Sequence, residues 1–429
     1  MRIRRLSKVT NMADNKSTER AGKSRHMTEL LSPAGDMERL IMAVTYGADA
    51  VYLAGTRFGM RAAAGNFSDE DMEEAVKLCR EHGVRVYVAC NAVMRDRDIQ
   101  ALPAFLERLQ SLKADAVIVS DLGALALAKK YAPSLGVHVS TQAGVMNAGS
   151  ANAYADLGAS RIVLAREMTL RDIASLREKT PRSLELEAFV HGSMCVSFSG
   201  RCLLSNYLTG RDANSGECAQ PCRWKYHLIE EKRPGELMEI TEDGGTFIMN
   251  SRDLCMIEHL PAMLEAGISS FKIEGRMKSA YYTAVMTNAY RHALDAAEKG
   301  VPAPPVWRNE VNNVSHREYS TGFYFDANGP GQYQDDAMYD SDGEVAAVVE
   351  SCDDAGNAFL TQRNKFFRGD TLELLTPGSE PVSFTASEIK NSEGADIEST
   401  PHPMMELRMR LPVKAPRYSI VRKMKRQNR

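Results

Sequence analysis

Four cysteines carry the clearest chemical signal in the sequence. Cys195, Cys202, Cys218 and Cys222 have the spacing C-x6-C-x15-C-x3-C, on a polar segment rich in Gly, Ser, Asn and Arg. Four thiolates are the ligand set of both a tetrahedral zinc ion and a 4Fe-4S cluster. Zinc sites tend to use two close cysteine pairs, and here only the second pair is close. The spacing therefore favours the cluster, with zinc as the alternative.

Two other interpretations of the four cysteines involve no metal. The pair Cys218 and Cys222 could form a transient disulfide, or all four could be unconnected buried thiols. Neither explains four cysteines on one polar segment, where free thiols would be exposed to oxidation. The remaining cysteines are scattered among apolar neighbours, which is typical of small buried side chains; they are Cys79, Cys90, Cys255 and Cys352.

A second chemical signal is the set of polar side chains that follow short apolar runs. Lys272 and Glu274 alternate with apolar residues, so both should point to one face of a strand, which is the inside of a barrel. We predict them as catalytic residues together with Glu187 and His191. An ion pair inside the barrel and a core histidine are the alternatives. The residues predicted to bind an anionic substrate are Arg61, Asn91, Gln142, Arg166, Arg276 and Lys278.

The elements that position these residues repeat a βα pattern. A Gly or another small residue, a short turn and an apolar run recur, for example at 47–54, 158–165 and 267–274, each after a segment with helical periodicity. Eight such strands are predicted: 30–33, 50–54, 84–91, 116–120, 137–141, 161–165, 184–190 and 270–274. They predict a TIM-like parallel (β/α)8 barrel, with an open doubly wound sheet as the alternative. No Gly-rich dinucleotide fingerprint follows the first strand, which favours the barrel.

The domain boundaries follow from changes in composition. Residues 1–26 are polar and basic and are predicted to be a disordered extension. The barrel occupies 27–300 and includes a cysteine-rich loop at 191–253. The proline-containing segment 301–335 is predicted to be a linker, 336–424 a small all-β domain, and 425–429 a basic tail.

Charge and hydropathy exclude several classes of protein. Lys and Arg total 53 against 56 Asp and Glu, a formal net charge of −3, so a uniformly basic nucleic-acid-binding surface is excluded. No apolar run reaches the roughly 18 residues of a membrane-spanning helix, and no secretory signal is visible. We therefore expect a cytoplasmic protein that does not bind membranes.

Several long motifs resemble peptidase family U32, the collagenase-like proteases. They are the segments 29–35 (ELLSPAG), 187–195 (EAFVHGSMC), 199–205 (SGRCLLS) and 271–278 (FKIEGRMK). The segment 319–323 (YSTGF) and the C-terminal β domain look like the branch of prephenate-dependent tRNA uridine hydroxylation proteins. The resemblance implies an α/β barrel with a 4Fe-4S cluster that hydroxylates position 5 of the wobble uridine in tRNA, using prephenate. Some members bind the cluster through a cysteine outside this loop, whereas here all four ligands fit within it.

The resemblance leaves other functions open. A peptidase is one alternative, although no His-Glu-x-x-His motif occurs and a Cys195–His191 pair would be crowded by three further thiols. A non-catalytic tRNA-binding scaffold is another. For the hydroxylase, Tyr207, Trp224 or Tyr226 could stack on the flipped base, with packing around the cluster as the alternative. The sequence also leaves open a homo- or hetero-oligomer with another family member.

Overall fold

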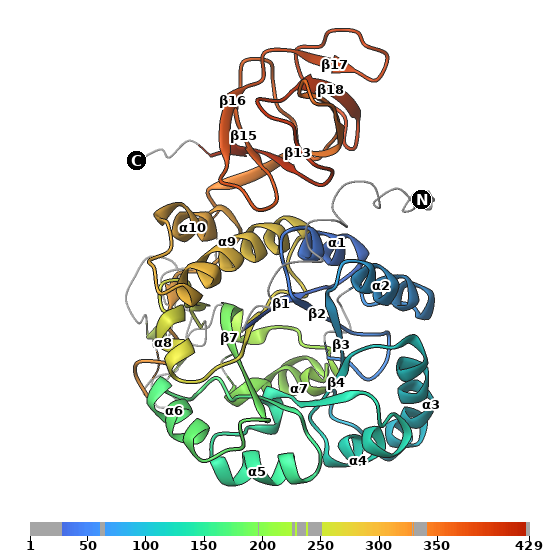
Figure 1. The fold of residues 1–429 in the computed structure, drawn as a ribbon, viewed down its shortest axis with the longest axis vertical. Helices are drawn as coiled ribbons and strands as arrows, with labels where there is room; N and C mark the ends of the chain where they lie inside the picture. The colour runs from blue at the N-terminus through green and yellow to red at the C-terminus, as the bar shows by residue number, and fades with distance from the viewer. Residues whose placement is uncertain are drawn as a thin grey trace.

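A computed structural model describes residues 28–60, 65–195, 197–224, 228–229, 237–238, 251–327, 329 and 341–425. An α/β barrel is followed along the chain by a smaller β domain (Figure 1). The predicted extension 1–26, the candidate Arg61 and most of the predicted tail, 426–429, lie outside the described residues. No helix in the described part of the chain is long and apolar enough to cross a membrane.

Eight parallel strands close into a barrel, which confirms the predicted fold. They are β1 (Glu29–Pro33), β2 (Ala50–Leu53), β3 (Arg85–Cys90), β4 (Ala116–Val119), β5 (Gly136–Val139), β6 (Arg161–Val163), β7 (Glu185–Ser193) and β11 (Ser270–Ile273). Each strand pairs with the next, and β11 pairs with both β7 and β1. The alternative of an open doubly wound sheet is wrong because this last pairing leaves no edge between the first and last strands.

Helices surround the strands on the outside of the barrel (Figure 1). They are α1 (Met37–Thr45), α2 (Asp69–Glu81), α3 (Asp96–Leu112), α4 (Leu122–Tyr131), α5 (Ala148–Asp156), α6 (Leu170–Glu178), α8 (Leu260–Glu265) and α9 (Ala280–Glu298). The repeated turn before the strands is left-handed, at Gly47, Lys113, Gly158 and Gly267. A left-handed residue after the last helical turn stops the helix and directs the chain into the next strand.

The core has two layers. Side chains on the outer face of the strands pack against the helices and form the main apolar cluster. Inside the barrel, one half of the wall is apolar and consists of Leu31, Ala50, Tyr52, Tyr87, Ala116 and Ile118. The other half, on β6, β7 and β11, carries buried charged side chains, which are described below.

The long connection between β7 and β11 carries most of the irregular structure. It contains η2 (Phe198–Gly200), α7 (Leu204–Thr209), η3 (Ala213–Ser215), η4 (Pro221–Arg223), the short pair β8 (Leu228–Ile229) and β9 (Leu237–Met238), and β10 (Asp253–Cys255). β10 runs antiparallel to β7, and β12 (Tyr319–Ser320) pairs with β10. η1 (Thr141–Ala143) lies in the loop after β5. These additions extend the sheet beyond β7, and the sequence did not predict them.

The described part of the predicted linker 301–335 has regular structure. This segment forms α10 (Pro305–Glu310), η5 (Val311–Asn313) and β12. Trp307 is buried, and its ring stacks on His292 of α9 with ring centres 4.0 Å apart. Proline suggested a break, but proline is favoured in the first turn of a helix, where its missing N–H is not needed. The segment therefore belongs to the barrel.

The C-terminal domain is a seven-stranded antiparallel sheet that forms a half-barrel. Its strands are β13 (Gly343–Cys352), β14 (Asn357–Gln362), β15 (Thr371–Leu375), β16 (Val382–Thr385), β17 (Ile389–Asn391), β18 (Glu406–Arg410) and β19 (Ile420–Met424), in the order β16-β15-β19-β13-β14-β18-β17. A separate apolar cluster fills its interior. The sheet confirms the small all-β domain that the sequence predicts.

The two domains are joined by buried polar contacts. The Arg422 guanidinium contacts both carboxylate oxygens of Glu310 at 2.7 Å and Glu373 of β15 at 2.7 Å. From the barrel, the Tyr46 hydroxyl donates to the carbonyl groups of Leu375 (3.2 Å) and Tyr418 (3.1 Å). The charge of Arg422 is therefore buried and neutralised between the two domains.

Candidate functional site

Three motifs meet at the carboxyl ends of β1, β7 and β11. A Cβ at Gly35 would overlap the backbone of Arg276, and one at Gly192 would overlap the backbone of Glu274. The Glu274 amide donates to the His191 carbonyl at 2.8 Å. Glycine at these two positions therefore lets the three strand ends approach closely. Because the carboxyl ends of all eight strands lie at one face, the following side chains gather there, at the barrel mouth.

Three predicted substrate-binding residues converge on Met60. The Met60 amide donates to Asn91 Oδ1 at 3.3 Å, the Gln142 side-chain amide contacts the Met60 sulfur, and the Arg276 guanidinium donates to the Met60 carbonyl. Asn91 and Gln142 are also linked through the Ser140 hydroxyl, at 3.5 Å on each side. The structure therefore brings Asn91, Gln142 and Arg276 together, around the residue that immediately precedes Arg61.

A second group contains Arg166 and Glu274. The Arg166 guanidinium donates to the Ser193 carbonyl at 2.9 Å, lies 3.7 Å above the Phe189 ring and is 3.9 Å from the Glu274 carboxylate. The Tyr52 hydroxyl, 3.2 Å from the same carboxylate, completes the group. Flat aromatic walls beside a guanidinium and a carboxylate can bind a ring that carries acidic groups.

Lys278 lies apart from these two groups. Its ammonium donates to the Ser315 carbonyl at 2.9 Å. Burial lowers the pKa of Lys278 to about 8, with Asp253 opposing the shift and Arg223 and Arg317 adding to it. Asp253 itself accepts from the Arg317 guanidinium at 2.6 Å in a buried ion pair. Lys278 therefore belongs to a charged group beside the cysteine loop.

The cysteine loop, residues 194–224, covers part of the barrel mouth. The Val93 amide, after β3, donates to the Asn214 carbonyl at 3.1 Å. After β6, Glu167 accepts from the Ser199 amide at 2.6 Å and from its hydroxyl at 2.7 Å. The Phe198 ring lies against Gly144, after β5. In Figure 1 α7 is accordingly seen within the outline of the barrel.

The four cysteines have the donor chemistry that a thiolate-bound metal centre requires. Cys195 is exposed, and Cys202, Cys218 and Cys222 are half-buried. The amides of Leu204 and Gln220 approach the sulfurs of Cys202 and Cys218 at 3.4 Å. Amide N–H groups directed at sulfur stabilise a bound thiolate and tune the potential of an iron–sulfur cluster.

Neighbouring thiols and guanidiniums shift the pKa of Cys222. Burial raises the pKa of the Cys222 thiol, and the thiols of Cys195 and Cys218 raise it further, whereas Arg223 and Arg317 lower it. Among the described residues, no three His, Cys, Asp or Glu side chains lie within reach of one metal ion.

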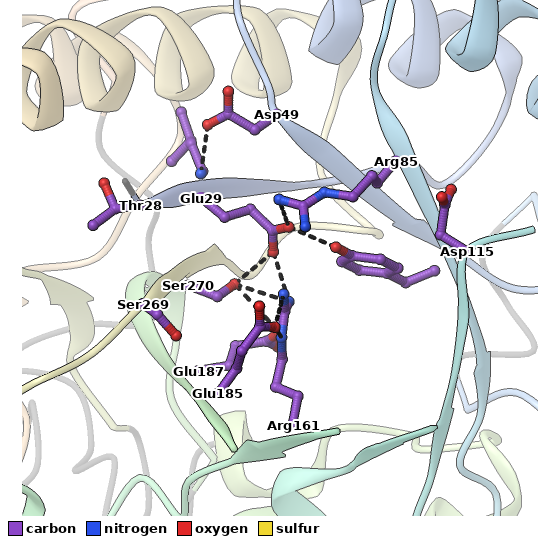
Figure 2. Close-up of polar contacts among 12 residues, drawn as sticks. Thr28, Glu29, Asp49, Arg85, Asp115, Arg161, Glu185, Glu187, Ser269 and Ser270 are labelled. Carbon is purple, nitrogen blue, oxygen red and sulfur yellow. Dashed lines mark hydrogen bonds and ion pairs between the residues drawn. The ribbon is translucent and has the colours of Figure 1, made fainter. Parts of the chain in front are cut away.

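Glu187 and Lys272 form an ion pair inside the barrel, and they belong to a larger network. Lys272 Nζ lies 2.8 Å from Glu187 Oε1, and Arg161 bridges Glu187 (2.9 Å) and Glu29 (2.6 Å). Figure 2 shows Glu29, Arg161 and Glu187 converging with Ser270, whose hydroxyl donates to Glu29 at 2.8 Å. The four buried charges are two acids and two bases, so they compensate one another. This geometry matches the alternative to a catalytic role, namely an ion pair that stabilises the inside of the barrel.

His191 does not join the other predicted catalytic residues. A bulge in β7 between Phe189 and His191 places His191 opposite Ile273 instead of Glu274. Its ring is fully buried between β7 and α9, with Nδ1 3.1 Å from the Tyr290 hydroxyl and Nε2 3.5 Å from that of Tyr319. Burial lowers the pKa of His191 to about 3. His191 is therefore neutral at pH 7 and packs between the barrel wall and the surrounding helices.

The candidate aromatic side chains lie on the cysteine loop. Tyr207, on α7, is 78% exposed and Trp224 is 41% exposed. Neither is therefore buried by packing in the described structure. Tyr226 lies outside the described residues.

Comparison with known sequences identifies the family. The sequence model of peptidase family U32 matches residues 35–334, and that of the peptidase family U32 C-terminal domain matches residues 336–422. The chain belongs to peptidase family U32.

Several U32 relatives match along much of the chain. The tRNA hydroxylation protein P1 of Bacillus subtilis is 34% identical over 403 residues, which is 92% of this chain and 94% of that protein. The tRNA hydroxylation protein P of Escherichia coli is 31% identical over 427 residues, or 87% and 91% of the two chains. An uncharacterized protease of Methanocaldococcus jannaschii is 43% identical over 304 residues, or 70% and 73%.

Sequence reasoning missed several residues of the site. Met60 and Tyr52 gave no signal, because their roles depend on strand ends that meet only in the closed barrel. Arg161 and Glu29 did have a sequence signal, because each is a charged residue at the start of a buried strand. A charge in that position must be paired inside the barrel, so it could have been assigned to an interior network.

Proposed function

We propose that this protein hydroxylates position 5 of the wobble uridine in tRNA, using prephenate and a 4Fe-4S cluster bound by Cys195, Cys202, Cys218 and Cys222. The observation that carries the proposal is the position of the cysteine loop, which is fixed to the loops after β3, β5 and β6 beside the polar barrel mouth. The tRNA hydroxylation proteins that match most of the chain support the reaction and the substrate.

The chain's own residues have distinct parts in this proposal. When bound, the cluster supplies a path for electrons next to the substrate. Arg166 and Arg276 bind the two carboxylates of prephenate, since a guanidinium forms paired hydrogen bonds with a carboxylate. Phe189, beside Arg166, provides an apolar wall for the prephenate ring. Asn91 and Gln142 hold the loop at Met60.

The peptidase alternative has a specific observation in its favour, namely the similarity to the archaeal relative named as a protease. It requires a thiol activated by a histidine. His191 is buried, neutral and bonded to Tyr290, whereas Cys195 is exposed. The hydroxylase therefore accounts for the arrangement of His191 and the four cysteines better than a cysteine protease does.

The test is mass spectrometry of tRNA from a strain that lacks the gene. We expect 5-hydroxyuridine and its derivatives to disappear from the wobble position and to return when the wild-type gene is restored, but not with Cys202→Ser. A Cys352→Ser gene, altered in the β domain, should restore the modification fully. If tRNA from the deletion strain keeps its wobble modification, the proposed substrate is wrong.

A further inference from the structure

The cysteine loop carries an unusual concentration of exposed apolar side chains. Five of them occur between residues 198 and 224, and we call them the loop patch: Phe198, Leu203, Tyr207, Leu208 and Trp224. Tyr207 and Leu208 lie on α7, which packs against η4 next to Trp224. Contiguous exposed apolar surface on a folded protein usually marks a binding face.

Neighbouring loops extend this face. Val93 after β3, Met146 after β5 and Met277 after β11 are also exposed, and all three follow carboxyl ends of barrel strands. The cysteine loop is fixed to the first two of these regions, through Asn214 to Val93 and through Phe198 to Gly144. The loop patch therefore lies at the rim of the barrel mouth.

The charges within the loop favour an anionic partner. Arg201 and Arg211 are exposed, and neither makes an ion pair within the part of the chain that the structure describes. The loop has two acidic residues, Asp212 and Glu217. Asp212 caps η3 and accepts a hydrogen bond from the Ser215 hydroxyl at 2.8 Å, so only Glu217 is an exposed acidic side chain of the loop. Exposed guanidiniums thus alternate with exposed aromatic rings along the loop.

We infer that the loop patch is the docking surface for the unpaired nucleotides of an RNA loop, with bases stacked on Tyr207 and Trp224 and phosphates bound by Arg201 and Arg211. This inference rests on the proposed function and adds the surface that recognises the substrate. Aromatic rings alternating with arginines suit single-stranded RNA, because each base offers a flat face and each linkage a negative charge. A second copy of the protein on the same face would cover the mouth through which the base must enter.

Binding of a fluorescently labelled anticodon stem-loop RNA to the full-length protein tests the inference. Tyr207→Ala and Trp224→Ala should each weaken binding roughly 5- to 100-fold, the range for one lost base stack. Phe367→Ala is the matched control, because Phe367 is 48% exposed on the β domain. Its affinity should equal that of the wild type. Arg201→Gln and Arg211→Gln should each lower the salt dependence of binding by about one ion.

Tryptophan fluorescence gives a second, independent readout. The chain has two tryptophans, and Trp307 is buried against His292, so RNA should quench only Trp224. The quenching should vanish in Trp224→Phe, whereas binding is largely kept because phenylalanine also stacks. A structural role for Trp224 would change thermal stability and would not produce this RNA-dependent signal.

Two results would overturn the inference. One is unchanged RNA affinity in the Tyr207→Ala and Trp224→Ala proteins. The other is a dimer of the wild-type protein that Tyr207→Ala dissociates without any effect on RNA binding. The proposed function is tested separately: it fails if tRNA from the deletion strain keeps its wobble modification, or if the wild-type gene does not restore a lost one. Normal modification by a protein that carries Tyr207→Ala would leave the function intact and remove the role of the loop patch.

Discussion

The surroundings of Arg166 indicate that it can bind a carboxylate of the substrate. Its guanidinium is oriented by the Ser193 carbonyl and the Phe189 ring and remains 3.9 Å from Glu274. At this distance the ion pair with Glu274 is weak, so a ligand carboxylate can compete for the guanidinium.

We therefore predict that Arg166→Gln raises the KM for prephenate roughly 10- to 100-fold, the effect of losing a hydrogen bond to a charged group. Iron content and thermal stability should stay close to those of the wild type. Steady-state hydroxylation of a stem-loop RNA at varied prephenate concentration measures this effect. Unchanged KM would show that prephenate binds elsewhere.

The burial of His191 predicts how the stability of the protein depends on pH. Its pKa is about 3 when folded, against an ordinary value of 6.5, so between these values the unfolded state binds more protons. The free energy of unfolding should therefore fall as pH drops below 6.5, by about 1.4 kcal/mol per pH unit for one such histidine. Urea unfolding of the wild type and of His191→Gln at pH 7.5 and 5.5 checks this. The variant should lose less stability on acidification; equal losses would contradict the burial of a neutral imidazole.

At the scale of single elements, the barrel depends on the compensated charges inside it. Burial alone would raise the pKa of Glu29, but Arg161 and Arg85 hold it below the ordinary value. Arg161 contacts both Glu29 and Glu187, so its removal leaves two buried carboxylates with one buried base between them (Figure 2).

Arg161→Met should consequently lower the free energy of unfolding by about 3–5 kcal/mol, as expected when one partner of a buried ion pair is lost. Arg85→Met is the control, because Arg85 also contacts Glu29 but its side chain is 40% exposed. Its loss should cost about 1 kcal/mol or less. Denaturant unfolding distinguishes the two variants, and equal costs would mean that the network does not stabilise the barrel.

The elements themselves could be predicted because local sequence determines them. The barrel strands are apolar runs, and β2, β4, β6 and β11 directly follow a left-handed turn that ends a helix. Both signals are local and do not depend on tertiary contacts. β10, β12 and β17 are two or three residues long and exist only because a neighbouring strand pairs with them. The orientation of His191 depends on a bulge, which shifts the register of β7 and has no sequence signal of its own.

At the scale of the whole molecule, the two domains form a continuous unit. Arg422 links β19 to α10 through Glu310, and Tyr46 contacts carbonyl groups of the β domain from the end of α1. The sequence indicated both domains but not this contact, because the partners of Arg422 come from distant segments, Glu310 of α10 and Glu373 of β15. The candidate site was also predicted only in part. Its residues could be predicted from the strand that each one follows, but their grouping around Met60 and Glu274 depends on the closed barrel.

The central claim is that four sulfurs of one loop bind a single inorganic centre beside the barrel mouth. Iron and acid-labile sulfide analysis of protein purified without oxygen tests it most directly. We predict about four irons and four sulfides per chain for the wild type and for Cys352→Ser. Clear loss of both is expected when Cys195, Cys202, Cys218 or Cys222 is replaced by Ser. Wild-type protein that contains zinc or no metal, or serine variants that keep their full iron, would contradict the claim.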